Sequence, residues 1–345
     1  MKEEGTRMAA VAVGSSQSAL PGSIDCPVDS SPGTTRMYRN RSVTNLLRMG
    51  HCAPTVMQTI LDSANTRQEW LVRLTASMPG GIGNTGFECG GVTSPLVLLG
   101  LRYGLGSVHN GLPLIFYKGS ALCERFLACN KTLLCKEIRG KDRLPLKCIP
   151  VIRHSPELHA ETIISDSKDA IPEEKRDSYA RLYAHLSEKC FHCSHAVFQN
   201  LRGMVPVTQE LINGLSAFLS GTLFQGRTCS AFTAGVMAVG LMTGEIENSY
   251  LRVIRMIAMM GMGGDALADG VNKFNKPMNT GYRMSKWFRR EFGSTQCMAI
   301  TQCDFSCPEG VTKYIESDCV TRCRTIAEMV AVIVQNILNE SNSLK

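Results

Sequence analysis

A pattern of cysteine, histidine and glycine occurs twice in this chain of 345 residues. In each copy a His-Cys pair is followed by a second cysteine, which lies 37 residues later in the first copy (Cys89) and 36 residues later in the second (Cys229). Glycines lie at −8, −3, +11 and +15 from that second cysteine in both copies. Matches of residue type and offset over such a distance indicate an internal duplication.

Each copy supplies at least four cysteines on separate segments, and four converging thiolates suit a structural zinc ion or an iron–sulfur cluster. The candidate metal ligands are Cys52, Cys89, Cys135 and Cys148 in the first copy and Cys193, Cys229, Cys297 and Cys319 in the second. The fourth position of the second copy stays open among Cys303, Cys307, Cys319 and Cys323. The pattern predicts one iron–sulfur or other metal site per copy, with zinc as the alternative cofactor.

The residues around the second cysteine of each copy fit a bound cluster. Cys89 and Cys229 are expected to begin helices, where the positive end of the helix dipole favours a thiolate, and they are the candidate redox cysteines. Glycines before them would let the backbone approach a cluster and direct N–H groups at its sulfur. These candidate cofactor-binding glycines are Gly80, Gly81, Gly86, Gly221 and Gly226.

Three other interpretations of the cysteines stay open. In a thiol–disulfide redox protein, Cys89 or Cys229 would attack and another cysteine of the same copy would resolve the mixed disulfide. In a structural zinc or non-catalytic binding module, the thiols would serve the fold alone. Cysteines are also small apolar residues that fill cores, although packing does not require cysteine at matched offsets.

Several shorter motifs carry less weight than the duplicated pattern. The segment 81–86 spells GxGxxG, but it follows a helical stretch, no βαβ unit surrounds it, and the second copy lacks the middle glycine, so we expect no nucleotide site. Cys190 and Cys193 form a CxxC pair that Ser194 follows, which excludes haem attachment and leaves a redox dithiol open. His51 and His192 are matched, and we expect them to cap or pack helices.

The sequence predicts that the segments carrying these cysteines are helices. Val92, Leu96 and Leu99 follow Cys89 at helical spacing, and apolar residues take the same offsets after Cys229. No segment alternates convincingly as a strand. We predict an all-α fold of two consecutive helical-bundle domains. The expected boundaries are a flexible leader at 1–41, repeat 1 at 42–152, a linker at 153–178 and repeat 2 at 179–340.

Composition limits the class of protein. Apolar residues at 44% and charged residues at 19% are globular values, and a net charge of +7 spread over scattered basic residues argues against nucleic-acid binding. No apolar run approaches the roughly 20 residues of a membrane span. The short apolar run near the N-terminus makes a poor secretory signal, so we expect a cytoplasmic protein. Its 15 cysteines cannot all pair within one chain, and in that compartment they would stay reduced or bind metal.

These residues resemble a family of redox-active proteins named for a C…GCAxxG…C…C signature. The matching segments are Cys52, Cys193–Val197, Cys89–Ser94, Cys229–Ala234, Gly100–Gly104, Gly240–Gly244 and Cys135–Gly140, with Cys148 and Cys319 as candidates for the last cysteine. The resemblance covers about 43–150 and 180–335, so the chain looks like a tandem member. Ser94 and Ala234 replace the last glycine of the central motif.

The resemblance implies redox chemistry, and a related helical domain occurs in cytochromes that also hold an iron–sulfur centre. We therefore expect a redox-active cysteine protein that binds iron–sulfur clusters and carries electrons to or from an unidentified partner protein. The sequence leaves open whether a substrate is turned over and whether the chain forms a homo-oligomer.

Overall fold

All the regular structure in the described part of the chain is helical. The computed structural model describes residues 32–105, 114–141, 144, 146–164, 173–246, 250–261 and 276–343. Across these residues the only β pairing is three isolated bridges, which confirms the predicted all-α class. No helix in the same ranges has the length and apolar character needed to cross a membrane.

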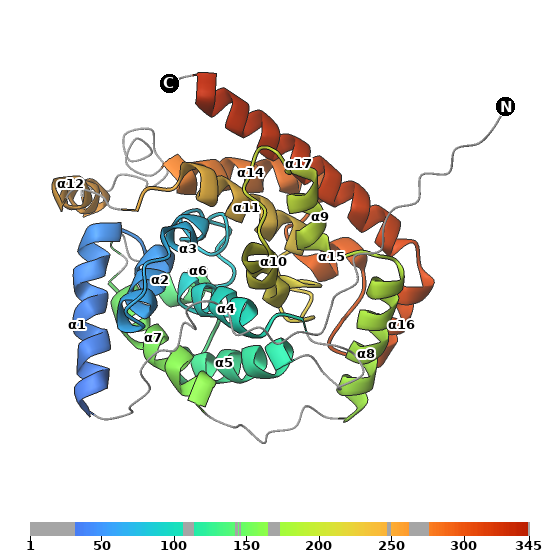
Figure 1. The fold of residues 1–345 in the computed structure, drawn as a ribbon, viewed down its shortest axis with the longest axis horizontal. Helices are drawn as coiled ribbons and strands as arrows, with labels where there is room; N and C mark the ends of the chain where they lie inside the picture. The colour runs from blue at the N-terminus through green and yellow to red at the C-terminus, as the bar shows by residue number, and fades with distance from the viewer. Residues whose placement is uncertain are drawn as a thin grey trace.

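The described residues of the first half form seven helices, which run from blue to green in Figure 1. They are α1 (Pro32–Met49), α2 (Cys52–Ser63), α3 (Glu69–Leu74), α4 (Gly90–Tyr103), α5 (Leu114–Asn130), α6 (Cys135–Arg139) and α7 (Cys148–Ile164). Of the predicted leader, residues 32–41 lie in α1, and residues 1–31 are outside the described part. The beginning of the predicted linker lies in α7.

The second half repeats this order with additions. Its elements are α8 (Glu173–Glu188), α9 (Cys193–Asn200), α10 (Gln209–Leu215), the 3-10 helix η2 (Ser216–Phe218), α11 (Ser230–Thr243), α12 (Tyr250–Gly261), α14 (Lys276–Phe292), α15 (Cys297–Thr301), α16 (Pro308–Glu316) and α17 (Cys319–Ser343). By their cysteines, α2, α4 and α6 correspond to α9, α11 and α15. The duplication thus extends from residue offsets to helix order.

The two central helices, α4 and α11, begin directly after the second cysteine of each copy. Cys89 and Cys229 are their N-cap residues, and nearly every residue of both helices is buried. A helix that is apolar on all sides is stable only when other helices surround it. His51 and His192 are the N-cap residues of α2 and α9, as predicted, and the His192 ring accepts from the His195 N–H at 3.5 Å.

The halves pack through reciprocal contacts of α4 and α11. An added Cβ on Gly100 of α4 would lie 2.7 Å from the Asn213 carbonyl oxygen of α10. An added Cβ on Gly240 of α11 would lie 2.8 Å from the Arg73 carbonyl oxygen of α3. Each glycine lies 11 residues after its cysteine, so equivalent surfaces meet from both sides. A single continuous core includes buried residues of both halves.

Candidate functional site

Helix starts place the cysteines of the first half. Cys52, Cys135 and Cys148 are the first residues of α2, α6 and α7, and Cys89 caps α4. The first N–H groups of a helix have no partner within it and carry partial positive charge. Four helix N-termini therefore bring their sulfurs and backbone donors to one part of the molecule.

The four sulfurs of this first-half group interact with one another. Cys89 and Cys135 form a side-chain hydrogen bond, and Cys52 lies close enough to Cys135 and Cys148 for their negative charges to repel. Backbone N–H groups of Gly80 and Ala53 hydrogen-bond to the Cys52 sulfur. The Gly91 N–H donates to Cys89 Sγ at 3.5 Å. The predicted residues Cys52, Cys89, Cys135 and Cys148 thus lie together.

This environment keeps three of the four thiols protonated. Burial, followed by charge repulsion from Cys135, raises the pKa of Cys52 and raises that of Cys148 to about 11. The pKa of Cys89 is raised because its thiol hydrogen-bonds to Cys135 and is buried. Cys135 is the exception, since that hydrogen bond and the nearby Arg139 lower its pKa. Of the four thiols, Cys135 is therefore the one that loses its proton most readily.

The second half holds an equivalent group of Cys193, Cys229, Cys297 and Cys323. The Cys193 thiol hydrogen-bonds to Cys323, which raises the pKa of Cys193, and the charges of Cys229 and Cys297 raise it further. Burial raises the pKa of Cys229 to about 12, against hydrogen bonds from the backbone of Phe232 and Ala231. The pKa of Cys323 is lowered because the Cys193 thiol and then the Tyr314 hydroxyl hydrogen-bond to it.

Cys319 occupies a different place from Cys323. In α7 the residues at +3, +4, +7 and +8 from Cys148 are buried, and in α17 the same offsets are buried when counted from Cys323. Counted from Cys319, the +3 residue Arg322 is exposed. The side chain of Cys319 instead hydrogen-bonds to that of Cys303. Among the four candidates for the last position, the structure brings Cys323 to the group, with Cys319 one helical turn earlier.

The candidate glycines shape the loops beside the groups. Gly80 has a φ of +78°, and its N–H hydrogen-bonds to the Cys52 sulfur. Gly221 has a φ of +75°, and a Cβ added there would lie 2.7 Å from Cys297 Cβ. Side chains at both positions would be strained; at Gly80 one would collide with Asn84, and at Gly221 with the Arg227 backbone nitrogen and with Cys297 Cβ. Gly86 and Gly226 lie against Lys136 and Met298, the residues after the third cysteines. Gly81 lies against the backbone of Phe87.

Three described cysteines, Cys123, Cys129 and Cys190, stand apart from the two groups. Cys190 is exposed in a turn before α9, while Cys193 of the same CxxC motif is buried and paired with Cys323. Cys123, which is buried, hydrogen-bonds to Arg227, and Cys129 is exposed. Sequence reasoning missed Tyr314 and Arg139 as neighbours of site sulfurs. Tyr314 lies in α16, nine residues before Cys323 of α17. Because a break separates the two helices, helical periodicity in the sequence could not predict this contact.

The arrangement of thiols differs from that of a single-ion site. Among the described residues, no group of three or more His, Cys, Asp or Glu side chains could hold one metal ion as it stands. An iron–sulfur cluster makes a different demand, since its four cysteines are divided among two or four irons. Four thiols with backbone N–H groups directed at their sulfurs are soft donors of the kind that zinc and iron–sulfur clusters both take.

Comparison with known proteins identifies a family for this chain. The sequence profile of the family described as "Putative redox-active protein (C_GCAxxG_C_C)" matches residues 50–162 and again 191–337, one segment for each repeat. No curated protein and no solved structure matches the chain. The two matches cover most of the chain and include all eight cysteines of the two groups, so the chain belongs to the C_GCAxxG_C_C family of redox-active proteins.

Proposed function

We propose that each four-cysteine group binds an iron–sulfur cluster and that the chain carries electrons between partner proteins. The ligands would be Cys52, Cys89, Cys135 and Cys148 in the first half and Cys193, Cys229, Cys297 and Cys323 in the second. The observation that supports this proposal best is the convergence of four thiols in each half. Cys52 and Cys148 are half-buried and the other six are buried, and six of the eight have a raised pKa.

Buried thiols of this kind are poor nucleophiles, because the thiolate is the reactive form and burial disfavours it. A soft metal reverses that balance, since a coordinated thiol loses its proton outright. The Cys52, Cys135 and Cys148 thiolates would repel one another if all were ionised, and a bound cation would offset that repulsion. A reducing compartment such as the cytoplasm would keep the thiols available.

When bound, the cluster supplies one-electron transfer, and the residues of the chain set how readily it occurs. Backbone N–H groups of Gly80, Ala53 and Gly91 stabilise negative charge on the first-half sulfurs. The Tyr314 hydroxyl does the same for Cys323. Hydrogen bonds to the cluster sulfurs and burial of the cluster shift its reduction potential in opposite directions. The hydrogen-bonding residues named above would therefore tune that potential.

A thiol–disulfide protein is the second candidate, and one observation favours it. Cys89 contacts Cys135 and Cys193 contacts Cys323, and in each pair one thiol has a lowered pKa. Each pair could lose two protons and two electrons to a disulfide-bearing partner, which would be reduced to two thiols. The first-half pair is the second and third cysteine of its group, whereas the second-half pair is the first and fourth. The pairing therefore differs between the halves, while the four-cysteine set is common to both.

The test is to purify the full chain without oxygen, record its visible spectrum and assay iron, acid-labile sulfide and zinc. Brown protein with iron and sulfide supports the proposal. Colourless protein without metal, whose free thiols decrease on oxidation, overturns it in favour of the thiol–disulfide function. Colourless protein with stoichiometric zinc also overturns it, in favour of a structural metal site.

A further inference from the structure

Cys303 and Cys319 form a pair of thiols beside the second four-cysteine group. Cys303 Sγ donates to the Thr301 carbonyl oxygen at 3.3 Å, and Cys319 Sγ donates to the same oxygen at 3.6 Å. The two side chains also hydrogen-bond to each other. Two thiols from separate elements, the loop after α15 and the start of α17, thus converge on one atom.

The surroundings give the two sulfurs different characters. The Arg322 guanidinium donates to Cys319 Sγ at 3.5 Å, and Cys319 is the first residue of the long helix α17. A guanidinium and a helix N-terminus both stabilise negative charge on a sulfur. Burial, followed by the charge of Cys319, raises the pKa of Cys303 to about 11. Cys319 therefore suits the attacking role and Cys303 the resolving role.

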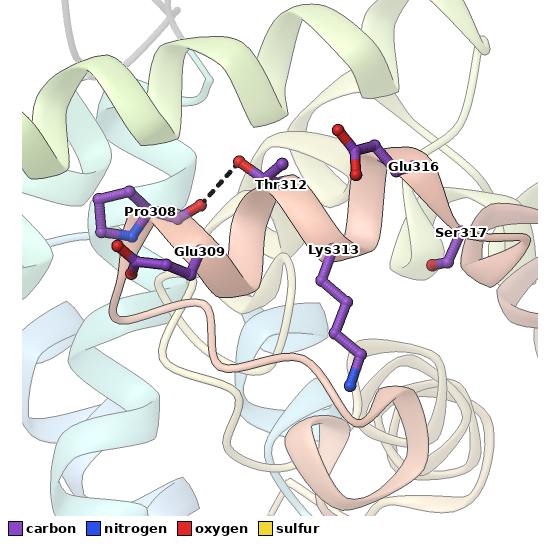
Figure 2. Close-up of a pocket in the computed structure, with 6 residues that line it drawn as sticks. All are labelled: Pro308, Glu309, Thr312, Lys313, Glu316 and Ser317. Atoms are coloured by element: carbon purple, nitrogen blue, oxygen red, sulfur yellow. Dashed lines mark hydrogen bonds between the residues drawn. The ribbon is translucent and has the colours of Figure 1, made fainter.

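The segment enclosed by the pair, 304–318, contains all of α16. Figure 2 shows the outer face of this helix, where Pro308, Glu309, Thr312, Lys313, Glu316 and Ser317 line a surface hollow of about 560 Å³. Lys313 Nζ donates to the Gln302 carbonyl oxygen at 2.7 Å and stabilises negative charge on the neighbouring Cys303. Ser317, at one end of the hollow, precedes Cys319 by two residues, so the hollow lies beside the chain segment that leads to Cys319.

The pair belongs to the second half alone. In the first half the segment between α6 and α7, residues 140–147, contains no cysteine. Cys303 and Cys319 are therefore additions to the repeated pattern, as is α16. They also adjoin the repeated site, because charges on both raise the pKa of Cys297 in the second four-cysteine group.

We propose that Cys303 and Cys319 are a reversible dithiol–disulfide couple, a second redox site distinct from the four-cysteine groups. The oxidant is a low-molecular-weight disulfide. The Cys319 sulfur attacks one of its sulfur atoms and releases one small thiol, and the Cys303 sulfur then attacks the mixed disulfide and releases the second. The new Cys303–Cys319 bond accounts for two electrons lost by the protein, which reduce the small disulfide to two thiols.

The experiment equilibrates the anaerobically purified full chain with mixtures of reduced and oxidised glutathione, a linear low-molecular-weight disulfide. Free thiols are then blocked and disulfide-linked peptides are identified by mass spectrometry. The wild-type chain is expected to yield one linked pair, Cys303 with Cys319, in a fraction that rises with the oxidised reagent and returns to zero on reduction. Cys303→Ser and Cys319→Ser should each abolish it, and Cys307→Ser, in the same loop, should leave it unchanged.

Absence of a Cys303–Cys319 link in the wild-type chain at any mixture would overturn the proposal, as would a dominant link from either residue to Cys307. The wild-type mapping decides this even where a serine variant fails to fold. Iron content is measured on the same sample, so a failure of the proposed iron–sulfur function is detected independently of the disulfide mapping. A chain without iron would add links within the four-cysteine groups and leave the assignment of this pair intact.

Discussion

Glu88 and Thr228 hold equivalent positions in the two repeats, directly before Cys89 and Cys229, and they hydrogen-bond to each other. The Glu88 carboxyl accepts from the Thr228 N–H at 3.0 Å and from the Thr228 hydroxyl, and both residues are buried. Contact between equivalent positions is the mark of a two-fold, isologous interface. The two repeats thus pack like the subunits of a symmetric dimer within one chain.

The Glu88 contact predicts a large loss of stability on truncation. Glu88→Ala would leave the buried Thr228 N–H without an acceptor, at a cost of about 2–4 kcal/mol in the free energy of unfolding. Glu88→Gln keeps one acceptor oxygen and should cost less. Urea unfolding measures the difference, with the exposed Glu188→Ala as the control. Equal stability of Glu88→Ala and wild type would contradict the account of the interface.

The reciprocal glycines predict matched destabilisation. Gly100→Ala and Gly240→Ala each place a Cβ under 3.0 Å from two backbone carbonyl oxygens of the other half. Overpacking of this kind costs about 1–3 kcal/mol, and the two variants should be similar because the contacts are equivalent. Gly214→Ala, on the opposite side of the first contact, meets nothing closer than 3.4 Å and serves as the control. Thermal unfolding that ranked Gly214→Ala with the other two would refute the two-fold arrangement.

Placement of Cys323 in the second group predicts a contrast within one helix. Cys323→Ser should remove the iron and sulfide of the second half, about half of the total, because its sulfur contacts Cys193. Cys319→Ser should retain them, since Cys319 pairs with Cys303. Iron and acid-labile sulfide per chain are the measurements. The opposite result, with loss on Cys319→Ser alone, would restore Cys319 as the fourth ligand.

Buried His159 predicts a dependence of stability on pH. Burial, with a smaller effect of Arg102, lowers its pKa to about 3 from the ordinary 6.5, and among the described residues neither ring nitrogen has a hydrogen-bond partner. The unfolded chain binds this proton first as pH falls, so stability is full above pH 6.5 and decreases toward pH 3. The slope is on the order of 1.4 kcal/mol per pH unit.

The control for this effect is His159→Leu, which puts an apolar side chain that does not titrate in the same place. The variant should unfold in urea with a shallower loss of stability between pH 6.5 and pH 4 than wild type, and with no loss at pH 7. Parallel pH profiles for the two proteins would show that His159 does not titrate as described.

Much of the fold follows from sequence, because apolar spacing, helix-starting cysteines and the duplicated offsets all depend on nearby residues. Cys89 and Cys229 cap their helices as expected. The partner of each cysteine depends on helix packing, which no local pattern encodes. Cys319, at the start of α17, resembles Cys148 by helix position, and only the burial spacing along α17 distinguishes it from Cys323. The contact of Glu88 with Thr228 likewise depends on how the halves meet.

The central claim is that two separate four-cysteine groups each hold a cluster. The most direct test is acid-labile sulfide per chain in the anaerobically purified wild type, Cys89→Ser and Cys229→Ser, with folding of each variant verified by circular dichroism. We predict that each variant retains about half of the wild-type sulfide and that the double variant retains none. Retention of all the sulfide in both single variants, its complete loss in both, or its absence from the wild type would contradict the claim.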